Sequence, residues 1–385
     1  MKLTHSYLFE KMIDPATNPC ATFLFVAVHK GPYLTLAALE GAVGVGKIQY
    51  LADGVCKRER KEFGLPYVDL EQIIQQWESL ENYLRKSDFS AVVRSTSEDV
   101  SGTNVEDLVS IAAQNTDTPL FVVEDFPGNY WPKPGQALSG LFTEASPGQD
   151  IHRSRGVDPS LIHNLSNPRY AALGDINKEK LREETRSSLG LKNETVMLWA
   201  GQPDGDNSYR ALERLLQPLG RLGAFLLFRP HPRDEYYTSG SYSDLLIGSG
   251  VNFLDVSSFA DITGLVCASD LVATQFSSVA VEAGHLGIPP LFVMFPDLGQ
   301  EYLASHKGYR LPPWSQDGCS FLIEEEDSVE KILEQALFDQ VSRDRVCVNF
   351  LARFGSTRGG AEAIIRQINR IMGQAIDETT KPVQV

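Results

Sequence analysis

A histidine held between prolines follows a short apolar stretch in the second half of the chain. In "AFLLFRPHPRDEYY", residues 224–237, this histidine is His231, and Arg229 and Arg233 lie on either side of it. The proline rings restrict the backbone that presents the imidazole. Arginine offers forked donors that suit phosphate oxygens, and histidine adds a donor or a proton. The spacing favours a receptor for a phosphate or diphosphate, although a stiff turn whose histidine caps a carbonyl would use the same residues.

A second pattern lies in "SDLVATQFSSVAVEAGHLGIPPLFV", residues 269–293. A strand is expected to end near Gln275, and Ser277 and Ser278 then begin a helix whose free N–H groups can bind an anion. Glu282 follows Ser278 by one helical turn on the same face, where a carboxylate can accept hydrogen bonds from both hydroxyls of a ribose. An ordinary helix cap followed by a solvated glutamate is the alternative. Taken with the histidine segment, the pattern predicts a nucleotide site.

Short apolar runs alternate with helical patterns along the chain, which predicts a doubly wound α/β fold with parallel sheets. Ligands of such sheets bind beyond the carboxyl ends of the strands, where both patterns fall. The expected strands are 22–28, 47–51, 91–95, 119–125, 195–201, 224–228, 251–255, 270–275 and 290–295. The expected helices include 69–86, 105–114, 178–190, 209–222, 259–269, 278–287 and 359–376.

The length of 385 residues predicts two domains. The rhythm of strands and helices breaks in the proline- and glycine-rich stretch 126–158. We therefore expect one Rossmann-like domain over 1–155, a second over 156–372 and a flexible tail over 373–385. Two such domains would face each other across a cleft.

The composition limits the class of partner. The net charge of −15 disfavours nucleic acid or anionic lipid as the main partner. The 5 cysteines form no CxxC pair, so neither a disulfide framework nor a zinc site is expected. No apolar run approaches the roughly 20 residues of a spanning helix, and the beginning of the sequence lacks the pattern of a signal peptide. These features predict a soluble cytoplasmic protein.

The order of four segments resembles the C-terminal nucleotide-sugar domain of GT-B glycosyltransferases. These segments are 163–173, 181–203, 226–232 and 259–293. The resemblance spans roughly residues 160–370, and the preceding half matches only in architecture. The group it points to makes bacterial surface glycans: polysialyltransferases, capsule transferases and CDP-glycerol glycerophosphotransferases. Hydrolysing UDP-N-acetylglucosamine 2-epimerases are relatives with the same fold.

The resemblance implies a metal-independent enzyme of glycan biosynthesis without a cofactor. It would move a sugar or polyol phosphate from a CMP-, CDP- or UDP-linked donor to an acceptor, either a small molecule or a glycan. The HP motif of the sialyltransferase branch matches His231 and Pro232, and its SS motif matches Ser277 and Ser278. Gly201 and Gln202, after an expected strand, would add backbone contacts to the donor. A homodimer is an open option.

The same branch carries an acidic motif, two acids and a glycine, that supplies the catalytic base. Here "FVVEDFPGN" places Glu124 and Asp125 at a strand end, with Gly128 two residues beyond the position of the motif's glycine. A carboxylate there would take the proton of the acceptor hydroxyl. The pattern does not separate the two acids, and the segment is also a good turn sequence.

The first strand, loop and helix of the fold correspond to "VAVHKGPYLTLAALEGA". His29, Lys30 and Gly31 would there approach the acceptor or the donor phosphate. A polar turn into a helix is the alternative, as is a solvated helix-start arginine for Arg358. Asp204 and Asp206 form an Asp-x-Asp pattern, but the position before a helix favours capping over metal binding.

Two other functions remain open. A UDP-sugar 2-epimerase would share the fold, but the HVEAGLR-like segment and the Asp-Ser-Gly-Gly run of those enzymes are missing from the sequence, and "TQFSSVAVEA" stands in the place of the latter. A non-catalytic GT-B-like binding subunit is the other, because the acidic motif departs from the family pattern.

Overall fold

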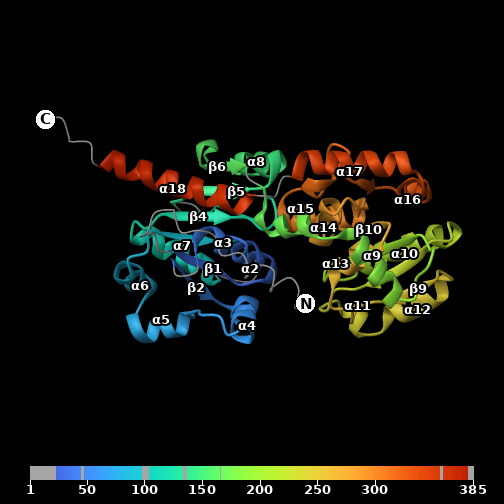
Figure 1. Cartoon of the computed structure of the whole chain (residues 1–385), viewed down its shortest axis with the longest axis horizontal. Coiled ribbons are helices and arrows are strands. Elements are labelled where there is room, and N and C mark those ends of the chain that lie inside the picture. Colours follow the sequence, from blue (N-terminus) through green and yellow to red (C-terminus); the bar gives the residue numbers. More distant parts are fainter. Residues whose placement is uncertain are drawn as a thin grey trace. The chain divides into compact units, whose positions relative to one another are not determined.

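The computed structural model describes residues 23–44, 47–97, 104–132, 137–164, 166–355 and 359–379. The chain forms two compact units: Lys2–Ala171 together with Thr357–Val385, and Ala172–Ser356. Figure 1 labels many of the elements of both. The division differs from the predicted boundary between residues 155 and 156, and the last helix belongs to the first unit instead of the second.

A six-stranded parallel sheet with the order β2-β1-β3-β4-β5-β6 forms the centre of the first unit. Its strands are β1 (Phe23–Ala27), β2 (Ile48–Ala52), β3 (Ala91–Arg94), β4 (Leu120–Val123), β5 (Gly140–Thr143) and β6 (Ile162–Asn164). Its helices are α2 (Lys30–Ala37), α3 (Glu40–Val43), α4 (Gly54–Glu62), α5 (Leu70–Trp77), α6 (Leu80–Ser87), α7 (Val105–Asn115), α8 (Ala145–Ser154) and α18 (Gly360–Thr379).

The second unit has a six-stranded parallel sheet with the order β12-β11-β10-β7-β8-β9. Its strands are β7 (Val196–Ala200), β8 (Phe225–Arg229), β9 (Phe253–Asp255), β10 (Leu271–Thr274), β11 (Pro290–Val293) and β12 (Phe321–Ile323). Its main helices are α9 (Lys178–Ser188), α10 (Asn207–Arg221), α11 (Glu235–Thr238), α12 (Ser241–Ser249), α13 (Ile262–Ala268), α14 (Ser278–His285), α15 (Glu301–Lys307), α16 (Val329–Phe338) and α17 (Gln340–Phe354).

Both sheets are buried on two faces, as the continuous apolar strands predict. In β1, Phe23 and Phe25 pack in one layer while Leu24 and Val26 pack in the opposite layer. In β7, Met197 and Trp199 face one core and Val196 and Leu198 the other. The doubly wound α/β fold is confirmed.

The proline- and glycine-rich stretch is not the connection between the units. Part of it lies between β4 and β5. The sheet then continues through β5 and β6, with α8 between them in the sequence. The last helix, α18, joins this unit because Ile364, Ile365 and Ile368 are buried in the same core as Phe25. Figure 1 shows α18 beside β4 and β5. The helix continues through Thr379, past the predicted start of a tail at 373, and residues 380–385 lie outside the described residues.

One predicted helix, 69–86, is in fact α5 and α6. Glu78 interrupts it with a φ of 69°. Ser79 then caps α6 by accepting a hydrogen bond from the backbone N–H of Asn82 at 3.1 Å. The periodic apolar pattern continues across the break, so it does not reveal the cap.

The strand order of the second sheet is that of the dinucleotide-binding Rossmann fold, in which ligands bind where the order reverses. That reversal lies between β7 and β10, which are neighbours in the sheet. In the first sheet, the corresponding reversal lies between β1 and β3. The predicted site residues follow strands at or beside these two points.

Candidate functional site

The loops after β7 and β8 contact each other directly. The Gly201 N–H donates to the carbonyl oxygen of Arg229 at 2.9 Å. A Cβ atom on residue 201 would lie 3.2 Å from Pro230 Cα and 3.4 Å from the His231 backbone nitrogen. Glycine therefore permits this close approach, and the structure brings Gly201 and His231 together.

The His231 imidazole is held by its own loop. Its Nδ1 accepts a hydrogen bond from the Arg233 N–H at 3.1 Å, which assigns the proton of the neutral ring to Nε2. Burial, together with the charge of Arg233, lowers the pKa of His231 to about 4. The half-buried ring is therefore neutral near pH 7 and offers an N–H donor through Nε2.

The flanking arginines differ in their surroundings. Arg229 is partly buried and its Nη1 donates to the carbonyl oxygens of Val256 at 3.2 Å and Phe259 at 2.5 Å. Burial lowers the pKa of Arg229, and the charges of Asp261 and Glu282 oppose this shift. Arg229 thus braces the loop after β9, whereas Arg233 is exposed to solvent.

The start of α14 is tied to the end of β7. Thr274 Oγ1 donates to the Ala200 carbonyl at 2.6 Å and accepts from the Ser277 N–H at 3.3 Å. Ser277 is the N-cap, and its hydroxyl accepts from the Val279 N–H, while Ser278 occupies the first helical position. The predicted helix start therefore lies at the strand-order reversal, next to the Gly201 loop.

Two residues predicted to contact the donor nucleotide are buried in the protein. Glu282 is 9% exposed, and its charge acts on Arg229. Gln275 is fully buried, and neither atom of its amide has a hydrogen-bond partner within the described part of the chain. A Cβ on Gly299 would lie 3.2 Å from Gln275 Nε2. Buried amides are almost always paired, so the unpaired amide of Gln275 is an exception beside the start of α14.

An acid that the sequence suggested only as a helix cap, and an aromatic stack that the sequence patterns missed, lie at this edge. Asp204 Oδ1 accepts from the Ser208 N–H at 3.0 Å, as its capping position predicts, but Oδ2 is buried without a partner among the described residues. Burial raises the pKa of Asp204 to about 7. Tyr302 stacks on Phe276 with 5.3 Å between ring centroids and on His306 with 4.1 Å. No spacing in the sequence links these rings.

In the first unit the structure separates the two candidate bases. Glu124 is buried, and its carboxylate accepts the N–H groups of Tyr130 at 2.7 Å and Gly128 at 3.1 Å. Its Oε2 also lies 2.9 Å from Nε2 of the buried His152. Glu124 thus holds the turn after β4, and its oxygen atoms are occupied by the protein.

Asp125 points to the reversal between β1 and β3 and remains partly exposed. Its Oδ1 accepts from Thr96 Oγ1 at 2.8 Å and from Asn129 Nδ2 at 3.1 Å. Burial raises the pKa of Asp125, while these hydrogen bonds and the charge of Arg169 oppose the increase. Asp125 is consequently the better candidate for a proton acceptor.

Of the three residues predicted after β1, Gly31 approaches Asp125 closely. A Cβ on Gly31 would lie 2.6 Å from Asp125 Oδ2 and 3.6 Å from Arg169 Nη1. His29 and Lys30 are exposed, and Lys30 Nζ lies 3.5 Å from Glu59 Oε1. The close approach at Gly31 brings the start of α2, Asp125 and Arg169 to one place.

A buried polar network, which the sequence patterns missed, supports this edge. Glu106 is fully buried, accepts from the Ser97 N–H at 2.7 Å and from Ser97 Oγ at 2.8 Å, and pairs with Arg94 at 3.1 Å. Ser97 Oγ in turn accepts the N–H groups of Val28 and His29. Burial raises the pKa of Glu106 to about 7. The network joins the ends of β1 and β3.

Over the described ranges, no helix is long and apolar enough to cross a bilayer. In the same part of the chain, no group of three or more His, Cys, Asp or Glu side chains is arranged to hold a metal ion. Arg358, considered above for a phosphate contact, lies outside the described residues.

No protein-family model matches the sequence, and no curated protein matches it. Solved structures do match the fold. The UDP-GlcNAc 2-epimerase of Methanocaldococcus jannaschii, in complex with UDP-GlcNAc and UDP, has a TM-score of 0.62 at 15% identity and covers 91% of this chain and 99% of its own. Anabaena HepE in complex with UDP has a TM-score of 0.60 at 15% identity, covering 91% of this chain and 100% of its own. The wall teichoic acid polymerase TagF has a TM-score of 0.54 at 18% identity, covering 92% and 90%. These likenesses confirm that the chain has the GT-B fold.

Proposed function

We propose that this protein is a metal-independent transferase that moves a sugar or polyol phosphate from a nucleotide-activated donor to an acceptor hydroxyl. The observation that carries the proposal is the meeting of Gly201, His231 and the start of α14 at the strand-order reversal of the second sheet. Reversals of this kind are where such sheets bind nucleotides.

In this proposal the second unit binds the donor. The first N–H groups of α14, with Ser277 and Ser278, would receive phosphate oxygens, because a helix start favours negative charge. His231 would add a hydrogen bond from Nε2, and the exposed Arg233 would add charge. The N–H groups of Gly201 and Gln202 already donate within the protein, to the Arg229 carbonyl at 2.9 Å and to Ser208 Oγ at 3.1 Å, so this loop would meet the donor nucleotide by close approach alone. Glu282 would hold the ribose. Gln275 would satisfy its amide on the donor or on an ordered water.

The neighbours suggest the donor's nucleotide. HepE is known in complex with UDP and with UDP-glucose, and the epimerase in complex with UDP-GlcNAc and UDP. We therefore rank UDP-linked donors ahead of CDP- and CMP-linked donors for this chain.

The first unit would hold the acceptor, with Asp125 as general base. As the acceptor oxygen forms its bond to the transferred group, Asp125 takes the hydroxyl proton. The bond to the donor phosphate breaks, and the nucleotide departs with the electron pair. Hydrogen-bond donors aimed at the departing phosphate stabilise the charge that develops there. A carboxylate with a raised pKa is a stronger base than an ordinary one, which suits this role.

A UDP-sugar 2-epimerase is the second candidate, since structures with that activity share the fold over nearly the whole chain. An epimerase would convert a UDP-sugar without any acceptor. The Asp-Ser-Gly-Gly run that such epimerases carry is replaced here by a segment with Gln275 and Phe276. We therefore place the transferase first.

A nucleotide panel tests both readings. UDP, CDP and CMP are titrated into the full chain by calorimetry, and the thermal midpoint is followed, because a ligand of the native state raises it. Each UDP-sugar that binds is then incubated with and without acceptor glycans, and the products are identified by mass and stereochemistry. Transfer only with acceptor supports the transferase, conversion without acceptor supports the epimerase, and no binding of any nucleotide refutes both.

A further inference from the structure

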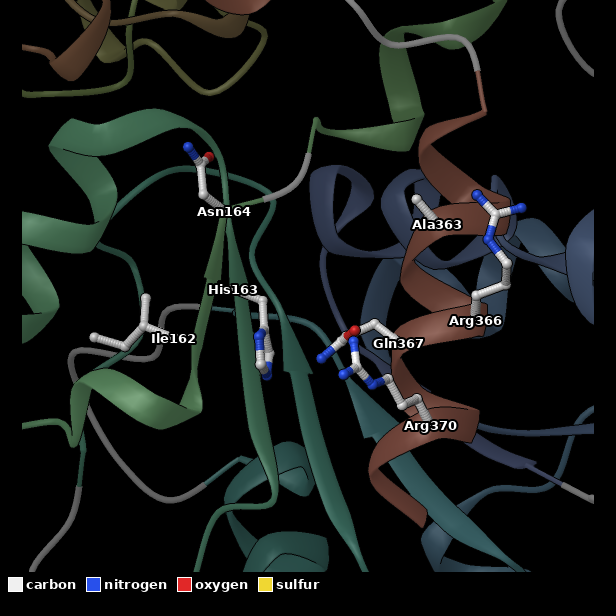
Figure 2. A pocket seen from close by; sticks show the side chains of 7 residues that line it. All are labelled: Ile162, His163, Asn164, Ala363, Arg366, Gln367 and Arg370. Atoms are coloured by element: carbon white, nitrogen blue, oxygen red, sulfur yellow. The ribbon is translucent and has the colours of Figure 1, made fainter. Parts of the chain in front are cut away.

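A hollow of about 530 Å³ lies in the first unit between the edge strand β6 and helix α18. Figure 2 shows His163 pointing from β6 toward Gln367 and Arg370, which project from α18. Arg366 and Asn164 also line it. The volume is within the range of small-ligand pockets, about 300–1,000 Å³.

The lining of this pocket is basic, although the whole chain is acidic. Its side chains include two guanidiniums, an imidazole and two amides, and they include no carboxylate. Arg366 and Arg370 are four residues apart on one face of α18, and within the described ranges neither forms an ion pair. Both guanidiniums are exposed, so they are available to an anion that enters the hollow.

The histidine contributes a second feature that points to a ligand. His163 Nε2 is buried and has no hydrogen-bond partner among the described residues. The ring packs against Phe142 with 5.2 Å between centroids, so its orientation is restricted. Burial lowers the pKa of His163, which favours the neutral ring as a hydrogen-bond donor or acceptor. Buried polar groups are normally hydrogen-bonded, but Nε2 is closed to solvent, so an occupant with polar atoms would reach it only through a small shift of the ring.

We propose that this pocket binds a phosphate group, which either a soluble phosphorylated compound or a lipid head group could carry. Forked guanidiniums match phosphate oxygens. Donors come from two elements, β6 and α18, and the several terminal oxygens of a phosphate can satisfy more of them than a carboxylate can. None of these residues has a part in the proposed donor site or at the proposed base, so the pocket is a separate site.

The test measures inorganic phosphate binding by calorimetry at low salt. The full chain carries His231→Ala throughout, which weakens phosphate binding at the proposed donor site. Whatever phosphate the start of α14 still binds is the same in every protein compared. In this background we compare two variants. One is the double variant with Arg366→Gln and Arg370→Gln, and the other is the control Arg58→Gln. Arg58 is an exposed arginine on α4 of the same unit, and glutamine keeps good helix propensity at all three positions.

We expect the paired glutamine variant to lose at least tenfold in phosphate affinity, and Arg58→Gln to bind as its parent does. Equal affinity in all three proteins would overturn the proposal. Circular dichroism and the thermal midpoint report whether the variants fold. Should the paired variant not fold, a phosphate-soaked crystal of the unchanged chain decides: density between His163 and Arg370 supports the site, and phosphate bound only elsewhere refutes it.

Vesicles separate the two sources of phosphate. Co-sedimentation is measured with phosphatidylcholine alone and with phosphatidylcholine containing phosphatidic acid. Binding to the second kind only, lost in the paired glutamine variant, identifies a lipid head group. Binding of inorganic phosphate without sedimentation identifies a soluble ligand. If the protein neither binds inorganic phosphate nor sediments with vesicles, the proposed site is refuted.

Discussion

Asp125 Oδ2 lies 2.6 Å from the point where a side chain on Gly31 would begin. Real Cβ atoms do not approach an oxygen so closely, so even a methyl group at position 31 requires the carboxylate to move. The first turn of α2 and the end of β4 can lie this close together because residue 31 has no side chain. This fit makes the position of Asp125 sensitive to a change on a different element.

Gly31→Ala should therefore reduce transfer activity by at least tenfold while leaving donor affinity unchanged. The added methyl group displaces Asp125 from Thr96 and Asn129, which now orient it. Turnover and nucleotide affinity are measured on the same preparation. Gly41→Ala is the matched control, because a Cβ there meets nothing within 4 Å. Full activity in Gly31→Ala would show that the geometry at Asp125 is not critical.

Asp125→Asn and Glu124→Gln should have opposite signatures. Loss of a general base costs about 10²- to 10⁴-fold in rate, so Asp125→Asn should bind donor normally and turn over slowly. Glu124→Gln should instead lower stability by about 1–3 kcal/mol, because it removes a carboxylate that accepts two backbone N–H groups beside His152.

Turnover, donor affinity and urea unfolding are measured for both variants. A slow but stable Glu124→Gln, paired with an active Asp125→Asn, would reverse the assignment of the base.

The elements and the ligand segments were predictable to different extents. Continuous apolar runs identified β1, β7, β8 and β10, because strands covered on both faces have no polar alternation. The four-residue strand β5, inside the proline- and glycine-rich stretch, and the three-residue strand β6, just beyond it, escaped prediction because such short runs carry no periodic signal. The apolar stripe of α18 predicted a buried helix, but a stripe does not specify which core it enters.

The site was predictable in its parts and not in its contacts. Local spacing placed His231 and Ser277 at strand ends, and the parallel sheet then brought those ends together. The difference between Glu124 and Asp125 depends on which backbone N–H groups each carboxylate meets. Those contacts arise from the turn after β4 and from distant strands, so two adjacent acids look equivalent in the sequence.

His231 variants distinguish binding from proton donation. Because the pKa of His231 is about 4, the ring should act first as a neutral Nε2–H donor. His231→Ala should weaken nucleotide binding by about ten- to a hundredfold, consistent with loss of a hydrogen bond to a charged group worth about 1.5–3 kcal/mol. His231→Gln places an amide N–H near the position of Nε2 and should retain most of the affinity.

Turnover of His231→Gln then decides the second role. Normal binding with turnover reduced tenfold or more would mean that the ring takes up a proton in the donor complex and transfers it, as an imidazolium, to the departing phosphate. Normal binding with normal turnover would limit the imidazole to holding it. An unchanged affinity in His231→Ala would remove His231 from the donor site.

Asp204 should make stability fall with rising pH. Burial raises its pKa from an ordinary 3.8 to about 7, so between these values the folded state binds more protons than the unfolded state. The slope of the unfolding free energy with pH is then negative across this window. Asp204→Asn cannot ionise and still accepts from the Ser208 N–H, so its stability relative to wild type should increase from pH 4 to pH 7, by on the order of 3 kcal/mol.

Urea unfolding at each pH measures the difference. Asp206→Asn, at an exposed position two residues on, should show no such trend. A constant difference between Asp204→Asn and wild type across the window would mean that Asp204 is already ionised at pH 4 and finds a partner for Oδ2 in solution.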